Sequence, residues 1–538
     1  MSSTFGTFNT ARLGIYAAQK GLDVTGNNIT NINTPGYTRQ RLEQTSLVTT
    51  ATDKYFSQYK TRVGQGVLTT GVSQLRDPGL DLLYRETQTD LSSADAKLKG
   101  VQDLASILDE VGKGDGEQDD GVILSQLNDL RDLISQAVTN GIDGYDGLIQ
   151  ASASALCTHF NQYAKLLESL KGTYETYLEQ DVSQVNALLT NIQRLNVSIR
   201  DADIRGDDAL ELRDERNRCL DELSQYMKID VKYTTEDVGA GLVVEKLTVS
   251  LSNEPPHNHT LVDGEYAAQV GVDLNDPDYG VNLYALRDLD GKKKNDQDWD
   301  PMQLQDNDLY GSLQSLREML TEKGEYATQG DVDKDSDALI KRGIPYYQNA
   351  LDNLAREFAE QMNELNKGPD GTTVEGAGVL FSQGSNNNDT DHITAANISV
   401  SKAWGEHTVS MVATWNPDAS SGDTSNLAAF LDVFSKKHAF NPGDIVAGAL
   451  GEEAPYEGTF EDMLLRIEST LAEDQMATES VLNNYAITYD EVYTDRDSVS
   501  GVDLNDEATN LMVYQKAYSA ACRLMTVLEE ALDALMAM

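Results

Sequence analysis

The sequence contains little cysteine and little positive charge, and each shortage excludes a class of protein. Three cysteines among 538 residues, Cys157, Cys219 and Cys522, are odd in number and widely spaced, which excludes a disulfide framework and a cysteine-based zinc site. Basic residues number 42 against 88 acidic residues, for a net charge of −46. A surface of this charge repels nucleic acid and anionic membranes, so we expect no nucleic-acid partner.

Long apolar runs are also missing. No stretch approaches the ~18 apolar residues that a membrane-spanning helix needs. The first residues, "MSSTFGTFNTARLGIYAAQKGLDV", lack the basic leader and uninterrupted apolar run of a secretory signal. The sequence therefore predicts no membrane insertion and no cleaved signal peptide.

Motifs for catalysis or metal binding are weak. Residues 331–342 begin like a calcium loop, but Ser336 stands where such loops need glycine and Arg342 where they need glutamate. His257 and His259 lie two residues apart after a Pro-Pro pair, and no further ligand is suitably spaced in the sequence. We expect no enzyme activity, no cofactor and no metal.

Both ends of the chain carry the seven-residue pattern of coiled-coil helices. Near the N-terminus the apolar positions recur at alternating steps of three and four, at Phe8, Ala11, Ile15, Ala18, Leu22, Thr25, Ile29 and Ile32. Several glycines and asparagines lower the helix propensity of this segment. Such a helix needs a partner, and without one it is expected to be largely disordered.

The C-terminal residues supply a matching pattern. Apolar residues lie seven apart at Leu504, Leu511, Tyr518, Met525 and Leu532, and again at Tyr514, Ala521, Leu528 and Leu535. Asp503 is the expected N-cap of this helix. Residues 1–70 hold seven basic and three acidic residues, whereas residues 501–538 hold two and six. We expect the two ends to pack together and against neighbouring subunits; a coiled coil within one chain is the alternative.

The middle of the chain alternates between helical and strand patterns. "IDVKY" and "LTVSL" alternate with period two in one β-rich stretch, and "ITAANISVS" and "HTVSMVATW" mark a second, loop-rich one. The predicted fold is mainly α with β-rich insertions. The expected domains are an inner coiled-coil domain (1–85 and 498–538), a helical bundle (86–228, 308–367 and 460–497), and two β-rich regions (229–307 and an outer insertion, 368–459).

The stretch "NNITNINTPGYTRQR", residues 27–41, predicts a helix end followed by a tight turn. Asparagine side chains compete for backbone hydrogen bonds and favour helix ends. Pro35 pushes Thr34 into extended geometry, and Pro35-Gly36 suits the centre of a type II turn with Gly36 at positive φ. On local evidence alone this is a helix stop near residue 32.

Two terminal segments resemble a known family. Residues 22–41, "LDVTGNNITNINTPGYTRQR", resemble the N-terminal signature of bacterial flagellar axial proteins, the rod, hook and hook-associated components. Residues 496–535, which begin "RDSVSGVDL", resemble their C-terminal signature. The interior segments 63–77, 210–231 and 350–366 resemble hook-associated members of this family.

The resemblance implies an inner coiled-coil tube domain and a ring of subunits at the hook–filament junction, needed for filament assembly and motility. It implies export by the flagellar type III pathway, without a cleaved signal, to the extracellular flagellum. The implied partners are further copies of the chain, the hook protein, a second junction protein and a cytoplasmic export chaperone that binds the C-terminal helix. The expected assembly-interface residues are Phe8, Ile15, Leu22, Asn28, Ile29, Asn33, Pro35, Gly36, Tyr37, Leu504, Leu511, Tyr514, Tyr518, Met525, Leu528, Leu532 and Leu535.

Three other assignments stay open. A hook or distal-rod protein would share the terminal signatures, although the helical blocks between the ends disfavour it. An enzyme would need clustered catalytic residues in one of the insertions. An adhesin-like module at residues 368–455 would face outward and bind a host glycan or protein.

Overall fold

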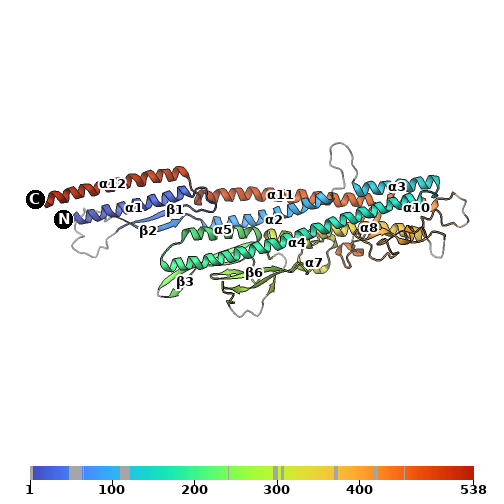
Figure 1. The fold of residues 1–538 in the computed structure, drawn as a ribbon, viewed down its shortest axis with the longest axis horizontal. Coiled ribbons are helices and arrows are strands. Elements are labelled where there is room, and N and C mark those ends of the chain that lie inside the picture. The colour runs from blue at the N-terminus through green and yellow to red at the C-terminus, as the bar shows by residue number, and fades with distance from the viewer. Residues whose placement is uncertain are drawn as a thin grey trace.

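The structure is a computed structural model that describes residues 4–47, 64, 66–108, 121–239, 241–294, 301–304, 308–368, 374–416, 418, 422–453 and 455–537. The molecule is elongated, with its helices along the long axis and both termini at one end (Figure 1). The main sheet lies along one side of the helices. The predicted fold class, mainly α with β-rich insertions, is confirmed.

The two chain ends form a pair of helices beyond the rest of the molecule. Helix α1 (Thr4–Thr30) lies beside α12 (Leu504–Met536). Strands β1 (Gln40–Ser46) and β2 (Val67–Gln74) form an antiparallel hairpin against α1. Asp503 accepts hydrogen bonds from the backbone N–H groups of Asn505 and Asp506, so the predicted N-cap of α12 is present.

Long helices form a rod that continues from this terminal pair along the long axis of the molecule. They are α2 (Pro78–Leu108), α3 (Val122–Asn140), α4 (Asp146–Arg205), α5 (Leu210–Tyr226) and α11 (Phe460–Ser500). Two separate apolar stripes of the sequence, at residues 156–177 and 182–199, lie on the single helix α4, since no proline interrupts them and the helix continues through Gly172. That helix ends at Gly206, whose φ of +81° is the left-handed conformation that glycine adopts most easily.

The first insertion is a six-stranded antiparallel meander. Its strands, in both chain and sheet order, are β3 (Ile229–Gly239), β4 (Leu242–Leu251), β5 (Thr260–Asp263), β6 (Tyr266–Val272), β7 (Val281–Arg287) and β8 (Met302–Gln303). "IDVKY" and "LTVSL" lie in β3 and β4, as predicted. Amides of α4 fasten the sheet to the rod: Asn186 exchanges two 2.8 Å hydrogen bonds with the backbone of Val270.

Further helices return from the sheet to the rod, and short elements follow them. The helices are α6 (Gly311–Thr321), η1 (Gly324–Tyr326), α7 (Gln329–Lys334) and α8 (Ile344–Lys367). The short elements are β9 (Phe381–Gln383), β10 (Ile398–Val400), α9 (Lys402–Gly405), α10 (Ser425–Ser435), β11 (His438–Phe440), η2 (Pro442–Asp444), η3 (Leu450–Glu453) and β12 (Tyr456–Gly458).

The second insertion contains less strand than its sequence predicts. "ITAANISVS" contributes the three residues of β10, and "HTVSMVATW" contributes no strand. Side chains of α8 replace strand partners here. Asn363 accepts from the N–H groups of Leu380 and Phe381 at 2.8 Å, and Asn366 donates to the carbonyl of Ser410 and accepts from the N–H of Val412. The backbone groups are thus satisfied without a sheet.

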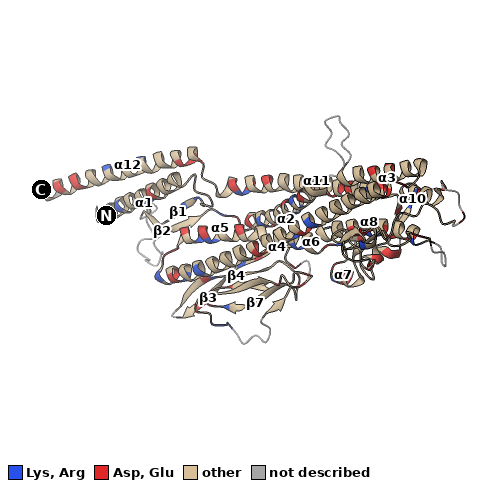
Figure 2. Ribbon diagram, turned by 45° about the vertical axis from the view of Figure 1, so that its right-hand side comes forward, with Lys and Arg blue, Asp and Glu red and all other residues tan. Residues whose placement is uncertain are grey.

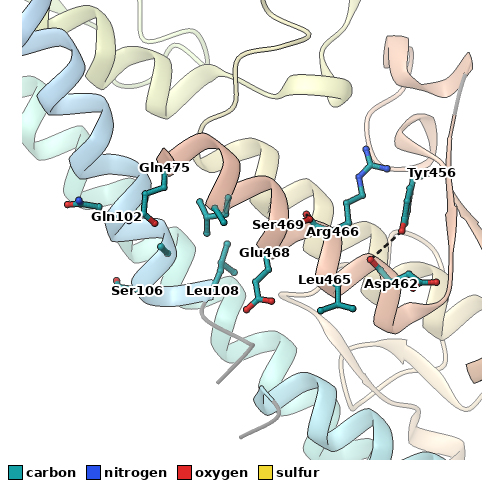
Figure 3. A pocket seen from close by; sticks show the side chains of 13 residues that line it. Gln102, Ser106, Leu108, Tyr456, Asp462, Leu465, Arg466, Glu468, Ser469 and Gln475 are labelled. Carbon is teal, nitrogen blue, oxygen red and sulfur yellow. Dashed lines mark hydrogen bonds between the residues drawn. The ribbon is translucent and has the colours of Figure 1, made fainter. Parts of the chain in front are cut away.

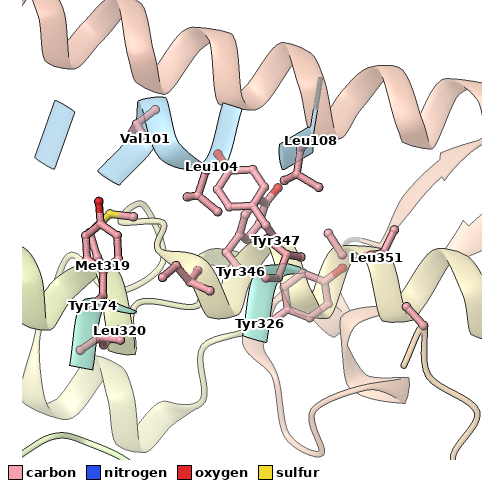
Figure 4. Packing of buried hydrophobic residues seen from close by; sticks show 14 of the residues in the cluster. Val101, Leu104, Leu108, Tyr174, Met319, Leu320, Tyr326, Tyr346, Tyr347 and Leu351 are labelled. Atoms are coloured by element: carbon pink, nitrogen blue, oxygen red, sulfur yellow. The ribbon is translucent and has the colours of Figure 1, made fainter. Parts of the chain in front are cut away.

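The core of the rod is one continuous apolar cluster. In Figure 4, Leu104 and Leu108 of α2 lie over the tyrosines of α8, with Tyr326 nearby. The Tyr347 hydroxyl donates to Asp474 of α11 at 3.0 Å. Buried tyrosines therefore add directional contacts between helices to the apolar packing.

A partly buried carboxyl in the rod makes its stability depend on pH. Burial first, and then neighbouring Glu318, raise the pKa of Glu322 to about 7 from 4.5. The folded chain keeps this proton at pH values where the unfolded chain has lost it, so stability falls as pH rises from about 4.5 to about 7. Glu322→Gln should therefore raise the free energy of unfolding at pH 8 by about 2 kcal/mol.

The measurement is urea unfolding at pH 8 and pH 4. At pH 4 the substitution is expected to change little, since the carboxyl is then neutral in both states. Exposed Glu364→Gln, on α8, is the control and should change neither value. An equal gain for Glu322→Gln at both pH values would refute the electrostatic explanation.

Candidate assembly interface

Small residues of α1 form its contact with α12. Ala11, Ala18 and Thr25 are buried at seven-residue spacing, as are Gly21 and Asn28. A β-carbon added to Gly21 would lie 2.5 Å from ring carbons of Tyr514. The glycine that lowers helix propensity therefore permits the close approach of the two helices.

The larger apolar residues of the predicted stripes lie at the edges of this contact. Half-buried are Phe8, Ile15, Leu22 and Ile29 on α1, and Tyr514, Met525, Leu528 and Leu532 on α12. Exposed are Leu504, Leu511 and Tyr518. The side chain of Leu535 lies outside the described residues. The structure thus brings part of the predicted set together and leaves the rest accessible.

A second apolar face of α12 points away from α1. Val513, Ala517, Ala520, Leu524, Val527 and Ala531 recur at steps of four and three. All six are exposed; Val513 is 57% and Val527 59% exposed. This set, the exposed α12 face, is rotated by about 100° from Tyr514, the helical turn angle of one residue. Few charges interrupt the middle of α12 (Figure 2).

The asparagine-rich segment after α1 folds back onto the helix. Gly36 has a φ of +77°, and the N–H of Tyr37 donates to the carbonyl of Thr34 at 3.2 Å, so the predicted tight turn is present. The Tyr37 hydroxyl donates to Asn28 Oδ1 at 2.8 Å. Burial first, and then Asp214, raise the pKa of Tyr37, which keeps this donor protonated.

Asn28 holds the strand that follows the turn. Its Nδ2 donates to the carbonyl of Gln40 at 2.9 Å, and its Oδ1 accepts from the N–H of Gln40 at 3.0 Å. Asn28 is only 1% exposed, whereas Asn33, Pro35 and Gly36 are exposed at the tip of the turn. The segment therefore ends α1, and the Asn28 side chain also holds β1 against α1.

Charged side chains join the two ends of the chain. The Arg39 Nε donates to Glu507 Oε1 at 2.8 Å, and the Glu507 side chain is 2% exposed. The Arg39 N–H donates to the carbonyl of Ser500 at 2.9 Å. The opposite charges of the two termini thus meet in a specific, largely buried ion pair.

An arginine–aspartate network, the joint network, joins α2, α5 and α11 and includes Arg76, which follows β2 of the hairpin that packs on α1. Arg496 of α11 contacts Asp81 at 2.9 Å and Asp221 at 2.7 Å, and its guanidinium lies 4.2 Å from the Tyr84 ring centroid. Two further arginines, Arg76 and Arg85, pair with the same aspartates at 3.0 and 2.8 Å. Burial, the largest single effect, works to raise the pKa of Asp81, but the hydrogen bonds and charge of Arg76 together with the charges of Arg496 and Arg85 outweigh it, and the pKa is lowered.

The sequence analysis did not identify the joint network. A signal was nevertheless available. Arg76, Asp221 and Arg496 lie in three separate segments that resemble flagellar axial proteins, 63–77, 210–231 and 496–535. Segments that share a resemblance but are distant in sequence are candidates for mutual contact.

The calcium-like stretch serves local structure. Asp331 accepts from the N–H of Thr328 at 2.8 Å in the capping box of α7. Its carboxylate also pairs with Lys323, and that of Asp335 pairs with Lys341 at 2.7 Å. These two carboxylates are therefore held by helix capping and ion pairs.

A groove of about 960 Å³ lies between α2 and α11 (Figure 3). The basic residue that lines the groove, Arg466, is paired with Glu325 at 2.7 Å, and its guanidinium lies 4.3 Å from the Tyr456 ring centroid. The described lining residues include neither histidine nor cysteine.

Family models match both ends and the middle of the chain. The models are described as "Flagella basal body rod protein" (residues 8–38), "Flagellar hook-associated protein FlgK helical domain" (residues 122–381) and "Flagellar basal body rod FlgEFG protein C-terminal" (residues 496–538).

Two full-length relatives are both named flagellar hook-associated protein 1. The Bacillus subtilis protein is 26% identical over 99% of this chain and 98% of its own length. The Salmonella typhimurium protein is 22% identical over 98% and 99%. A solved structure, the flagellar hook junction protein FlgK from Burkholderia pseudomallei, aligns with a TM-score of 0.41 and 18% identity over 56% of this chain and 47% of that chain.

The paired terminal helices, the helical rod and these matches define a structural protein of the bacterial flagellar axis. Within the described residues, no helix has the length and apolar character needed to cross a membrane. The chain matches flagellar hook-associated protein 1 over nearly its full length, and its middle matches the helical-domain model of that protein.

Proposed function

We propose that this chain forms the hook–filament junction ring by packing its paired terminal helices around the flagellar axis. The exposed α12 face carries the proposal, because its six apolar residues continue a coiled-coil spacing on the side away from α1. Burial of this face against a neighbouring copy would stabilise the ring by about 25 cal/mol per Å² of apolar surface.

The proposed ring has axial and transient partners. Further copies of the chain flank each subunit, the hook protein lies on one side, and a second junction protein lies on the other. Before export, a cytoplasmic chaperone covers the exposed α12 face, since an uncovered apolar surface of this kind promotes aggregation. Export follows the flagellar type III pathway without a cleaved signal, and the assembled protein is extracellular.

The proposed role is structural rather than enzymatic. Residues 1–85 and 498–538 form the inner domain, the rod helices the next shell, and the regions 229–307 and 368–459 the outer parts. The position of the sheet along one side of the rod in Figure 1 supports this proposed division. The interface needs apolar packing and fixed helix ends, and no reactive group.

A single charge on the exposed α12 face tests the proposal. Val527→Asp should leave the folded chain intact, because this side chain is 59% exposed. In the ring the carboxylate would be buried without a partner, a cost of at least about 3 kcal/mol per interface, or more than about 100-fold in affinity. Cells with this variant should release filament protein into the medium and fail to swim.

Thr526→Asp is the matched control, because Thr526 is an exposed neighbour on another side of α12. It should support swimming and normal filaments. Thermal unfolding of both purified variants should match that of the parent chain. Normal filaments in cells that carry Val527→Asp would reject the exposed α12 face as an assembly surface.

A further inference from the structure

Two histidines and an aspartate meet where the sheet joins the rod. His257 and His259 lie in the loop between β4 and β5, and Asp308 precedes α6. One potential ligand atom from each residue lies within 4.8 Å of the others. The sequence shows no third ligand near the histidines, whereas the fold supplies one from a distant segment.

The backbone around this cluster is held by hydrogen bonds. Asn253 Nδ2 donates to the carbonyl of Asp308 at 2.8 Å and to that of His257 at 3.4 Å. The carbonyl of His259 accepts from the N–H of Leu251 at 2.9 Å. Both sides of the cluster are therefore positioned before any ligand binds.

The donor types, and the one short separation between His257 and Asp308, suit a zinc ion. His257 Nδ1 lies 3.4 Å from Asp308 Oδ1. In a tetrahedral zinc site with bonds of about 2.0–2.1 Å, neighbouring ligand atoms are about 3.3 Å apart. Two imidazoles and one carboxylate are borderline and hard donors, which suit Zn²⁺ better than Ca²⁺ or Mg²⁺.

The surroundings favour a metal site over an incidental surface cluster. Asp308 is buried, and the two histidines are half-buried. The His257 and His259 rings lie with centroids 6.5 Å apart and planes at 76°, so they are not stacked on each other. Their nitrogens can thus approach one ion from different directions.

We propose that His257, His259 and Asp308 bind one Zn²⁺ ion, with water as the fourth ligand. The bound ion links the sheet to the rod. The neighbouring main-chain contacts show which parts would be joined. The N–H of Lys228, after α5, donates to the carbonyl of Leu309, and the N–H of Ser252, in the sheet loop, donates to the carbonyl of Lys228. An ion here fixes the sheet loop, the end of α5 and the start of α6 together. This inference does not depend on the proposed ring.

Calorimetry with zinc chloride tests the site on the full-length chain after treatment with a chelator. One ion per chain should bind, and it should raise the midpoint of thermal unfolding. His259→Ala and the isosteric Asp308→Asn should each weaken binding by at least about tenfold, since even loss of an outer-shell partner costs 10–100-fold. Cobalt(II) should give the visible absorption of a four-coordinate site, which both variants lose.

His159→Ala is the matched control, because His159 lies in α4, in another part of the chain. It should bind zinc like the parent chain. If zinc fails to bind the parent chain, the site does not exist. If zinc binds His257→Ala/His259→Ala with unchanged affinity and stoichiometry, the ion is held elsewhere and the proposal is overturned.

Discussion

Deletion of residues 504–538 is expected to abolish swimming and leave the rod and sheet folded. Among the described residues of α12, Glu507 is the one that is buried, and the continuous core cluster ends at Leu471. The rod therefore keeps its apolar core without α12. The terminal pair does not, because the small residues of α1 lose the surface they pack against and an isolated helix of this composition is unstable.

Three measurements separate these effects. Circular dichroism and thermal unfolding should show a folded rod in the truncated chain. Limited proteolysis should cut residues 4–30 much faster than in the parent chain. Cells should release filament protein into the medium and form no swimming halo in soft agar. Removal of residues 537–538 alone is the control, because α12 ends at Met536. Normal filaments on cells with the longer deletion would refute the assembly role of α12.

Arg496→Met is expected to destabilise the chain by about 3–5 kcal/mol, the largest effect of a single substitution predicted here. The Arg496 side chain is 17% exposed, and it contacts two carboxylates, of Asp81 and Asp221, that are themselves largely buried. Methionine keeps much of the volume but leaves these carboxylates with less positive charge nearby. Removal of one partner from a buried ion pair costs more than the pair itself contributes.

Urea unfolding at neutral pH measures this loss. Arg131→Met, at a more exposed arginine on α3, is the control and should change stability by less than about 1 kcal/mol. Adding Asp221→Asn to Arg496→Met should recover part of the loss, since it removes one of the carboxylates that the substitution leaves poorly paired. A loss of less than 1 kcal/mol for Arg496→Met, or additive losses in the double variant, would show that the joint network contributes little to stability.

The local sequence pattern predicted turns and strands best where one physical requirement decided the backbone conformation. The Pro35-Gly36 turn follows from the restricted φ of proline and the positive φ open to glycine. The period-two stretches at 229–233 and 247–251 became paired strands: β4 packs against α4, and β3 pairs with β4 and contacts α2. In "HTVSMVATW", the same alternation did not give a strand, since Asn366 satisfies the local backbone from α8.

The residues that make the close α1–α12 contact were predicted less well than the helices that carry them. The large apolar residues of the heptads drew attention to Phe8 and Ile15, whereas small residues such as Ala18 and Gly21 make the closest contact with α12. Hydrophobic periodicity reports which side of a helix is buried. It does not report how closely a partner approaches, which depends on the shape of both surfaces.

The sequence by itself determined that both ends are coiled-coil helices, that a tight turn follows the first, that long helices separate two stretches of strand-like and loop-rich pattern, and that the termini carry opposite charge. These properties follow from spacing, propensity and composition along the chain. Only the tertiary structure decided that Arg496 meets Asp81 and Asp221, and that Asp308 joins His257 and His259. Such contacts depend on the register in which distant helices and strands pack, and no local pattern encodes that register.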